Sequence, residues 1–285
     1  MRILAVDTST IAASVAIMEN DKLLIEYFVD SKENHSQKIV PMIDEVLRNM
    51  GMKPYDIDLF AVITGPGSFT GLRIGVTTIK TMAYAMKKPV RGVTTLDTLA
   101  FNIPICDAII CPIINARNNQ VYTALYQWKD GKQERITDYM GIDVGELIQK
   151  IKETIKDSNK KAFILGDGVR VYKEQFLKEL KEACLFPPEN LMLQKASSVA
   201  AIVMNELKQC ESNRLKEPDI EEPGKEESDK METDKEGTYK EETDKKELYK
   251  KKSNKKELDI EEMDRQEPDK KGPGRKVPGK KESDR

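Results

Sequence analysis

The sequence has 285 residues, of which 39% are hydrophobic and 34% are charged, and its formal net charge is −2. The charge is unevenly distributed, because residues 211–285 hold 21 of the 47 basic and 24 of the 49 acidic side chains. The remaining 26 basic and 25 acidic side chains in residues 1–210 are balanced, which argues against independent nucleic-acid binding. Residues 1–210 have the composition of an ordinary globular body. We predict that residues 211–285 form a disordered charged tail, because they cannot bury enough apolar surface to offset the entropy of ordering.

Simple patterns also argue against membrane, secreted and metal-dependent classes. No run approaches the roughly 18–20 apolar residues that span a bilayer, and the N-terminal apolar run stops at Asp7, too early for a secretory signal. We therefore expect a cytoplasmic protein whose four cysteines are reduced thiols. Cys106 and Cys111 lack the second pair that a zinc site needs, and His35 is the single histidine. We expect no metal, no cofactor and no histidine-based catalysis.

The first hundred residues predict alternating strands and helices. Ile39, Ile43 and Val46 repeat at helical spacing, and Gly51 follows where a helix C-cap is expected. In chain order the pattern predicts three strands, a helix, a strand, a helix, a strand and a short helix: Arg2–Thr8, Ala13–Met18, Leu23–Val29, 36–50, Leu59–Thr64, Leu72–Met86, Pro89–Val93 and Thr95–Phe101.

The following residues partly repeat this order. Two strands, a helix, a strand and two helices are predicted at Ala108–Asn115, Val121–Trp128, Val144–Ile155, Ala162–Leu165, Tyr172–Ala183 and Ser197–Lys208. Two successive units of this kind predict an α/β fold of two similar halves, residues 1–103 and 104–210. A single irregular α/β domain is the alternative, since periodicity alone does not distinguish the two.

Asp7, at the end of the first predicted strand, is one candidate for chemistry. A carboxylate there could hold a hydrated magnesium ion beside a nucleotide phosphate. A phosphate approaches the backbone most easily where a glycine follows, but the residues here are Thr8, Ser9 and Thr10. These residues favour a structural aspartate over a metal-positioning one. The matching turn of the second half, Asn115–Gln120, also lacks glycine and carboxylate, so a nucleotide site would lack groups on both walls.

The second candidate is the glycine-rich junction between the fourth strand and the next helix. Gly65, Gly67, Ser68 and Thr70 could bind an anion through the unpaired amides of a helix N-terminus. No Gly-Lys-Ser/Thr follows, so this is not a Walker loop. The alternative is a tight turn in which glycines adopt positive φ and Ser68 or Thr70 caps the helix. Gly166-Asp167-Gly168 is likewise predicted to be a chain turn.

The helix at Leu72–Met86 is unusual because only Arg73 and Lys80 in it are charged. A surface helix normally has one polar face, so a helix that is apolar or small nearly all round should be covered on both sides. One cover would be the sheet, and we expect the other to be a second protein. The alternative is a helix enclosed entirely by its own domain.

Five segments together resemble a known family. ILAVDTST, NHSQKIVPMIDEVL, AVITGPGSFTGLRIGVTTIKTMAYA, GVTTLDTLA and INARNNQVYTALY, in that order, resemble the bacterial TsaB proteins over about residues 1–205. The resemblance implies a duplicated actin-like fold of the ASKHA and RNase H-like class. Members usually read Asp-Ala-Arg where this chain has Asn115-Ala116-Arg117. They also usually close with a Pro-x-Tyr-x-Arg-like segment, whose place is taken here by Arg214–Pro218.

The resemblance also implies a function. TsaB is the dimerisation subunit of the tRNA threonylcarbamoyladenosine machinery, so the chain is expected to be non-catalytic. The implied partners are the catalytic paralogue TsaD and the small P-loop ATPase TsaE, with tRNA bound through the complex and a homodimer as the alternative assembly of the chain alone. The helices at 36–50 and 70–86 would meet the partner, and the interface residues expected from them are Met42, Gly71, Leu72, Arg73, Gly75, Val76 and Ile79. From the residues alone, the alternative is an actin-fold small-molecule kinase that uses Asp7 and magnesium.

Overall fold

The computed structural model describes residues 1–30, 35–156, 158 and 160–214 of the chain. Its first sheet has the strand order β3-β2-β1-β4-β5, in which β1, β2 and β3 are antiparallel and β1, β4 and β5 are parallel. The strands are β1 (Arg2–Asp7), β2 (Ala12–Glu19), β3 (Lys22–Asp30), β4 (Leu59–Gly65) and β5 (Val90–Thr94). The predicted strands of this half are confirmed within a few residues at each end.

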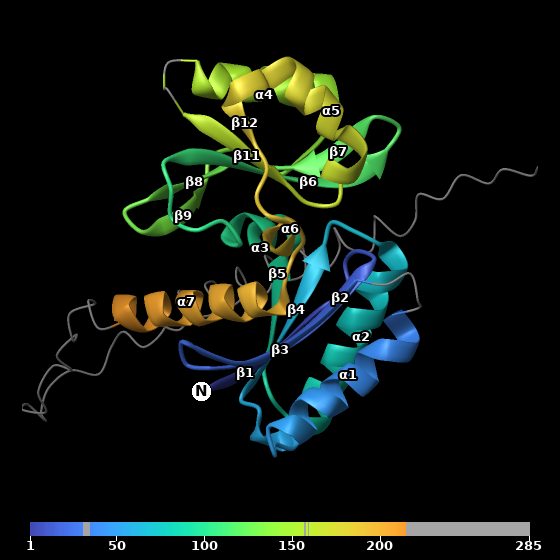
Figure 1. Cartoon of the computed structure of the whole chain (residues 1–285). Helices are drawn as coiled ribbons and strands as arrows, with labels where there is room; N and C mark the ends of the chain where they lie inside the picture. Colours follow the sequence, from blue (N-terminus) through green and yellow to red (C-terminus); the bar gives the residue numbers. More distant parts are fainter. Residues whose placement is uncertain (31–34, 157, 159, 215–285) are drawn as a thin grey trace, which may run out of the picture. The chain divides into compact units, whose positions relative to one another are not determined.

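Helices cover both faces of the first sheet (Figure 1). Side chains alternate along β1, so that Leu4 and Val6 face α1 (His35–Asn49) and α2 (Phe69–Met86). Ile3 and Ala5 face the opposite helix, α7 (Ala196–Arg214). The short helix η1 (Pro54–Asp56) joins α1 to β4. Because both faces are buried, the strands are apolar almost throughout rather than alternating.

The second sheet repeats the plan of the first. Its order is β10-β7-β6-β11-β12, with β10, β7 and β6 antiparallel and β6, β11 and β12 parallel, and β8 pairs with β6 and β9. The strands are β6 (Ala108–Arg117), β7 (Gln120–Thr123), β8 (Tyr126–Lys129), β9 (Lys132–Arg135), β10 (Met140–Asp143), β11 (Lys161–Leu165) and β12 (Cys184–Leu185). The helices are α4 (Val144–Ile155), α5 (Val169–Leu180), η2 (Lys181–Ala183) and α6 (Glu189–Met192). The predicted α/β fold of two similar halves is confirmed.

Two helices pack across the boundary between the halves. The short helix α3 (Thr95–Phe101) places Leu96 and Leu99 in the core of the second sheet. In the opposite direction, Val199 and Val203 of α7 pack on the first sheet. The division expected from sequence, at residue 103, falls between these two helices, of which α3 contacts both sheets and α7 packs on the first. Helix α7 also runs to Arg214, past the predicted start of the tail, and the rest of the predicted tail lies outside the described residues.

One region of the second half was predicted wrongly. The single strand expected at Val121–Trp128 is two strands, β7 and β8, and the β8–β9 hairpin and β10 were not predicted. The hairpin turns at Asp130-Gly131, where both residues have positive φ. An Asp-Gly pair is a recognised hairpin signal, but β9 reads Lys-Gln-Glu-Arg and carries no hydrophobic alternation.

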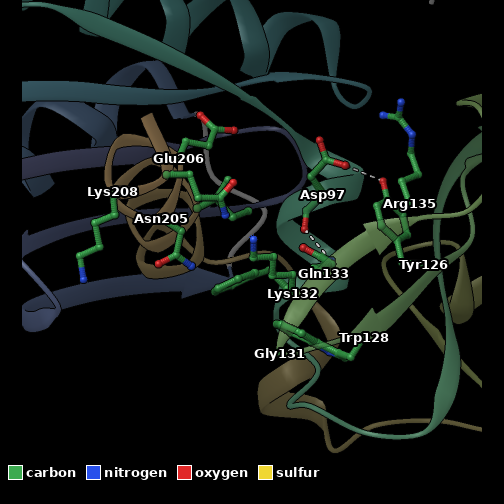
Figure 2. Close-up of a pocket in the computed structure, with 13 residues that line it drawn as sticks. Asp97, Tyr126, Trp128, Gly131, Lys132, Gln133, Arg135, Asn205, Glu206 and Lys208 are labelled. Carbon is green, nitrogen blue, oxygen red and sulfur yellow. Dashed lines mark hydrogen bonds between the residues drawn. The ribbon is translucent and has the colours of Figure 1, made fainter. Parts of the chain in front are cut away.

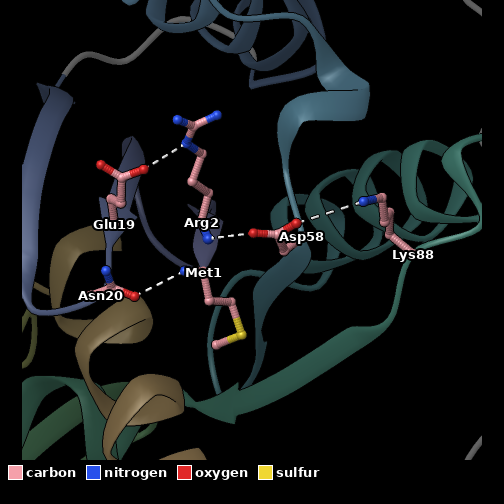
Figure 3. A network of polar contacts seen from close by, with 6 residues as sticks. All are labelled: Met1, Arg2, Glu19, Asn20, Asp58 and Lys88. Atoms are coloured by element: carbon pink, nitrogen blue, oxygen red, sulfur yellow. Dashed lines mark hydrogen bonds and ion pairs between the residues drawn. The ribbon is translucent and has the colours of Figure 1, made fainter.

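Polar contacts stabilise the N-terminal end of β1 (Figure 3). Arg2 Nε lies 2.8 Å from Glu19 Oε1, and the Arg2 backbone N–H donates to Asp58 Oδ2 at 2.8 Å. Asp58 also lies 3.7 Å from Lys88 Nζ. These exposed pairs contribute modest stability and fix the register of β1 relative to β2 and β4. Among the described residues, no helix is long and apolar enough to cross a membrane.

Candidate functional site

The turn between β1 and β2 contains the first candidate, Asp7, and it is closed. Asp7 is 1% exposed, and Thr8, Ser9 and Thr10 are buried beside it. The Ser9 backbone N–H donates to Asp7 Oδ1 at 2.7 Å. Burial raises the pKa of Asp7 to about 6, although hydrogen bonds from Ser9 and Gln194 oppose that rise. Asp7 thus takes part in the internal hydrogen bonding of the turn, as the structural interpretation predicted.

Gln194 fills the space above the turn. It lies between α6 and α7 and is 1% exposed. Its Nε2 donates to Ser9 Oγ at 2.6 Å and to Thr10 Oγ1 at 3.0 Å. Nothing in the sequence pattern identified Gln194, because an isolated glutamine between two helices carries no periodic or motif signal. A phosphate placed over this turn would have to displace it.

The glycine-rich junction packs against the same turn rather than opening toward a ligand. The Ser68 backbone N–H donates to Ser9 O at 2.6 Å, and a Cβ at Gly67 would lie 2.3 Å from that same oxygen. Gly67 has φ +158° and Gly65 has φ +118°, values that side-chain-bearing residues rarely adopt. Ser68 is the N-cap of α2, its Oγ accepting from the Gly71 backbone N–H, whereas Thr70 is exposed. The tight-turn interpretation is therefore the one that the structure supports.

The segments of the second half that would form the other wall of a nucleotide site are also bonded to one another. Asp167 Oδ1 accepts from the Asn115 backbone N–H at 2.9 Å, and burial raises the pKa of Asp167. Gly166 has φ +106°, and a Cβ there would lie 2.3 Å from Ile113 O. The Gly166–Gly168 segment is a chain turn, as predicted. Arg170, at the start of α5, pairs with Asp30 at the end of β3 at 2.8 Å and so links the two halves. In the described part of the chain, no group of three or more His, Cys, Asp and Glu side chains could hold a metal ion.

The surface of α2, which was expected to meet a partner, does not include four of the predicted interface residues. Gly71 and Gly75 face the β1–β2 turn, where Cβ atoms would lie 2.1 Å from Thr8 O and 2.3 Å from Thr8 Oγ1. Ile79 and Met42 are buried in the core between α1, α2 and the sheet. These four residues were predicted to contact a partner, whereas in this structure the chain's own residues cover them.

The remaining predicted residues lie nearer the surface. Leu72 and Val76 are half-buried against their own core, and Arg73 is exposed. The Arg73 guanidinium stacks 3.8 Å from the centroid of the Phe69 ring, which is 62% exposed. Tyr84, near the other end of α2, is 87% exposed. The solvent-facing side of α2 therefore carries two aromatic rings, an arginine and threonines.

A separate hollow of about 470 Å³ lies between α3, α7 and the β8–β9 hairpin (Figure 2). Its carboxylate, Asp97, accepts from the hydroxyls of Tyr126 at 2.8 Å and Tyr139 at 2.7 Å. Burial, followed by the neighbouring Asp97, raises the pKa of Tyr126 well above its usual range. Lys132 and Lys208 line the hollow together with Glu206. The Asp97 carboxylate thus has hydrogen-bond partners inside the protein, and these hydrogen bonds hold α3 against the second half.

Comparisons with known proteins identify relatives of this chain. Residues 29–226 match the family model described as TsaD, tRNA N6-adenosine threonylcarbamoyltransferase. The chain is 36% identical over 174 residues to the tRNA threonylcarbamoyladenosine biosynthesis protein TsaB of Bacillus subtilis, covering 61% of this chain and 74% of that protein. It is 32% identical to the protein of the same name from Buchnera aphidicola subsp. Schizaphis graminum, covering 65% of this chain and 88% of that protein.

Two solved structures show the same fold. YeaZ from Pseudomonas aeruginosa superposes with a TM-score of 0.60 at 24% identity, covering 74% of this chain and 93% of that chain. An uncharacterized Pseudomonas aeruginosa protein described as similar to peptidase YeaZ gives 0.62 at 23% identity, covering 73% and 92%. The order of the segments, the duplicated sheets and the matched relatives agree, and the chain belongs to the TsaB family.

Proposed function

We propose that this chain is a non-catalytic subunit in the synthesis of tRNA N6-threonylcarbamoyladenosine. In this proposal it pairs with a TsaD-like catalytic subunit in the cytoplasm and activates it. A TsaE-like P-loop ATPase joins the assembly, and tRNA contacts the complex rather than this chain directly. Family membership supports the pathway, because the relatives carry the name of that biosynthesis.

The observation that carries the non-catalytic role is the closed β1–β2 turn. In an actin-like fold, a kinase would need this turn to receive a phosphate and a metal ion. Here Asp7 is buried, three hydroxyl side chains follow it, and Gln194 donates hydrogen bonds to two of them. The amides and hydroxyls that would bind a nucleotide are used by the protein, which supports the scaffold role over the kinase alternative.

The outer side of α1 and α2 supports pairing. Phe69 and Tyr84 expose large rings, and Val40 on α1 is 56% exposed. Exposed aromatic side chains beside an arginine are typical of protein interfaces. A groove of about 380 Å³ lies between α1, the start of η1 and Met82 of α2, lined by Val40, Ile43, Asp44, Leu47, Arg48, Met52, Lys53, Pro54 and Met82. We call the exposed stripe Phe69, Arg73, Thr77 and Tyr84 of α2, together with this groove, the partner face.

Thr77→Arg tests the partner face, because it adds a long charged side chain at an exposed position of α2 without entering the core. Thr154→Arg on α4 is the matched control, since Thr154 is also exposed and helical but lies on the second half. With a purified TsaD-like subunit, the wild type and Thr154→Arg should co-elute with it on gel filtration. Thr77→Arg should weaken binding at least about tenfold.

Two results would count against the proposal. Absence of any complex with the wild-type chain would contradict the pairing role. Threonylcarbamoyl transfer or ATP turnover by the chain alone, abolished by Asp7→Ala, would contradict the non-catalytic role. Equal binding by Thr77→Arg and Thr154→Arg would keep the pairing but place the interface on another surface.

A further inference from the structure

The connector between α6 and α7 is held in place by both halves. From the first half, Asn102 Nδ2 donates to Leu193 O at 2.7 Å and to Leu191 O at 3.3 Å. From the second half, the Gly166 backbone N–H donates to Met192 O at 2.9 Å. Ser14 Oγ accepts from the first backbone N–H of α7, that of Ala196, at 2.9 Å. The position of residue 194 is therefore fixed by several elements.

Gln194 joins this connector to the start of α2 through the β1–β2 turn. Its Nε2 holds the hydroxyls of Ser9 and Thr10, and Ser9 O accepts from the Ser68 backbone N–H. Ser68 in turn caps α2, whose first residue is Phe69. A continuous path of hydrogen bonds thus runs from the connector to the end of the partner face.

Steric contact makes this path stiff. The turn is wedged against Gly67, Gly71 and Gly75, each of which would place a Cβ within 2.3 Å of an atom of Thr8 or Ser9. Thr8 Oγ1 also donates to Gly71 O at 2.7 Å. Because closely packed elements do not move independently, a shift of the turn moves the first two turns of α2.

Gln194 is also poorly suited to a purely stabilising role. Its Oε1 is buried and has no hydrogen-bond partner among the described residues. A buried acceptor without a partner destabilises the fold, which offsets much of what the two Nε2 hydrogen bonds contribute. An apolar side chain of the same size would lose those bonds and also remove the unpaired oxygen.

We propose that Gln194 is a positioning residue, which sets the N-terminal end of α2 and so couples the connector between the halves to partner binding. The role of the face rests on the proposed function, whereas the positioning of α2 does not. Gln194→Met keeps the side-chain volume and removes the hydrogen bonds. Val203→Ala is the control, because it destabilises α7 on the same sheet without touching the turn.

Hydrogen exchange and affinity for the TsaD-like subunit test this inference in the full chain. In Gln194→Met, amides of residues 67–72 should exchange about tenfold faster, the factor that corresponds to loss of about 1.4 kcal/mol of local protection. Partner affinity should fall several-fold. Val203→Ala should change neither the exchange of these amides nor the partner affinity. Gln149→Met on α4 should match the wild type in both measurements.

The outcomes separate the two parts of the inference. Unchanged exchange at residues 67–72 in Gln194→Met would overturn the positioning role. Faster exchange with unchanged affinity would overturn the coupling to partner binding. If the wild-type chain bound no partner at all, the proposed function would fail, while the exchange measurement would still decide whether Gln194 positions α2.

Discussion

Replacing Asp7 by asparagine should stabilise the protein at neutral pH and have little effect near pH 4. The carboxylate is fully buried, and burial raises its pKa from the ordinary value of 3.8 to about 6. In the pH range between those two values the folded protein binds more protons than the unfolded chain does. Its stability therefore falls as pH rises from about 4 to about 6, and the loss is complete above pH 6.

The size of the effect follows from the two pKa values. Each pKa unit corresponds to about 1.36 kcal/mol, so the difference between a pKa of 3.8 and one of about 6 corresponds to about 3 kcal/mol of unfolding free energy. In Asp7→Asn, the side-chain carbonyl can still accept the hydrogen bond that the Ser9 backbone N–H gives to Asp7 Oδ1. The amide nitrogen that the substitution introduces can replace an oxygen that accepts hydrogen bonds from Ser9 and Gln194, and losing those bonds would reduce the gain.

Urea unfolding of the wild type and Asp7→Asn at pH 7.5 and pH 4 measures this difference directly. Burial also raises the pKa of Asp167, so the comparison between the two proteins isolates Asp7. Asp107→Asn is the control, because that side chain is 85% exposed and should show no gain at either pH. The reasoning fails if Asp7→Asn is less stable than the wild type at pH 7.5, since the charged form would then be the favoured one.

Two further predictions test the close packing. Gly75→Ala should lower the unfolding free energy by about 1–3 kcal/mol, because its Cβ would lie 2.3 Å from Thr8 Oγ1. In urea unfolding, Thr8→Ala should recover part of that loss in the double variant, whereas purely additive effects would mean that the two residues are not in contact. Among the cysteines, exposed Cys210 should react rapidly with a thiol reagent in the folded protein. Burial raises the pKa of Cys111 to about 12, so Cys111 should react only on unfolding, and a rate equal to that of Cys210 would show that the second core is open.

Hydrophobic periodicity was sufficient to predict most of the fold. In α1, Ile39, Ile43, Val46 and Leu47 form the buried stripe that their spacing indicates. In β1 the apolar run indicated a strand buried on both faces, and it is covered by α1 and α2 on one side and α7 on the other. Among the elements that were missed, β9 reads Lys-Gln-Glu-Arg and shows no hydrophobic alternation. Others, such as β10, β12 and α6, are only two to four residues long, too short for a periodic signal.

The candidate site was predictable only in part. A turn without glycine after Asp7 favoured a structural aspartate, and Asp7 is hydrogen-bonded within the turn. The pattern did not reveal Gln194, which is brought there by tertiary structure from 184 residues beyond Thr10. The near absence of charge in α2 predicted a helix covered on both sides, one cover being a second protein. In the structure one face of α2 is buried and the opposite face is exposed. Composition could not say which residues face which neighbour, and Gly71 and Gly75, which were expected at the partner surface, face the β1–β2 turn.

The placement of the glycines explains how the cleft is closed. In a phosphate-binding turn, glycine leaves room in the turn itself for an anion. Here the turn carries Thr8, Ser9 and Thr10, and glycine occurs instead on the elements opposite, at positions 67, 71 and 75. The space that these glycines leave is filled by the side chains and carbonyls of the turn. The turn and α2 therefore approach each other closely, and this contact orients the helix whose outer side we propose as the partner face.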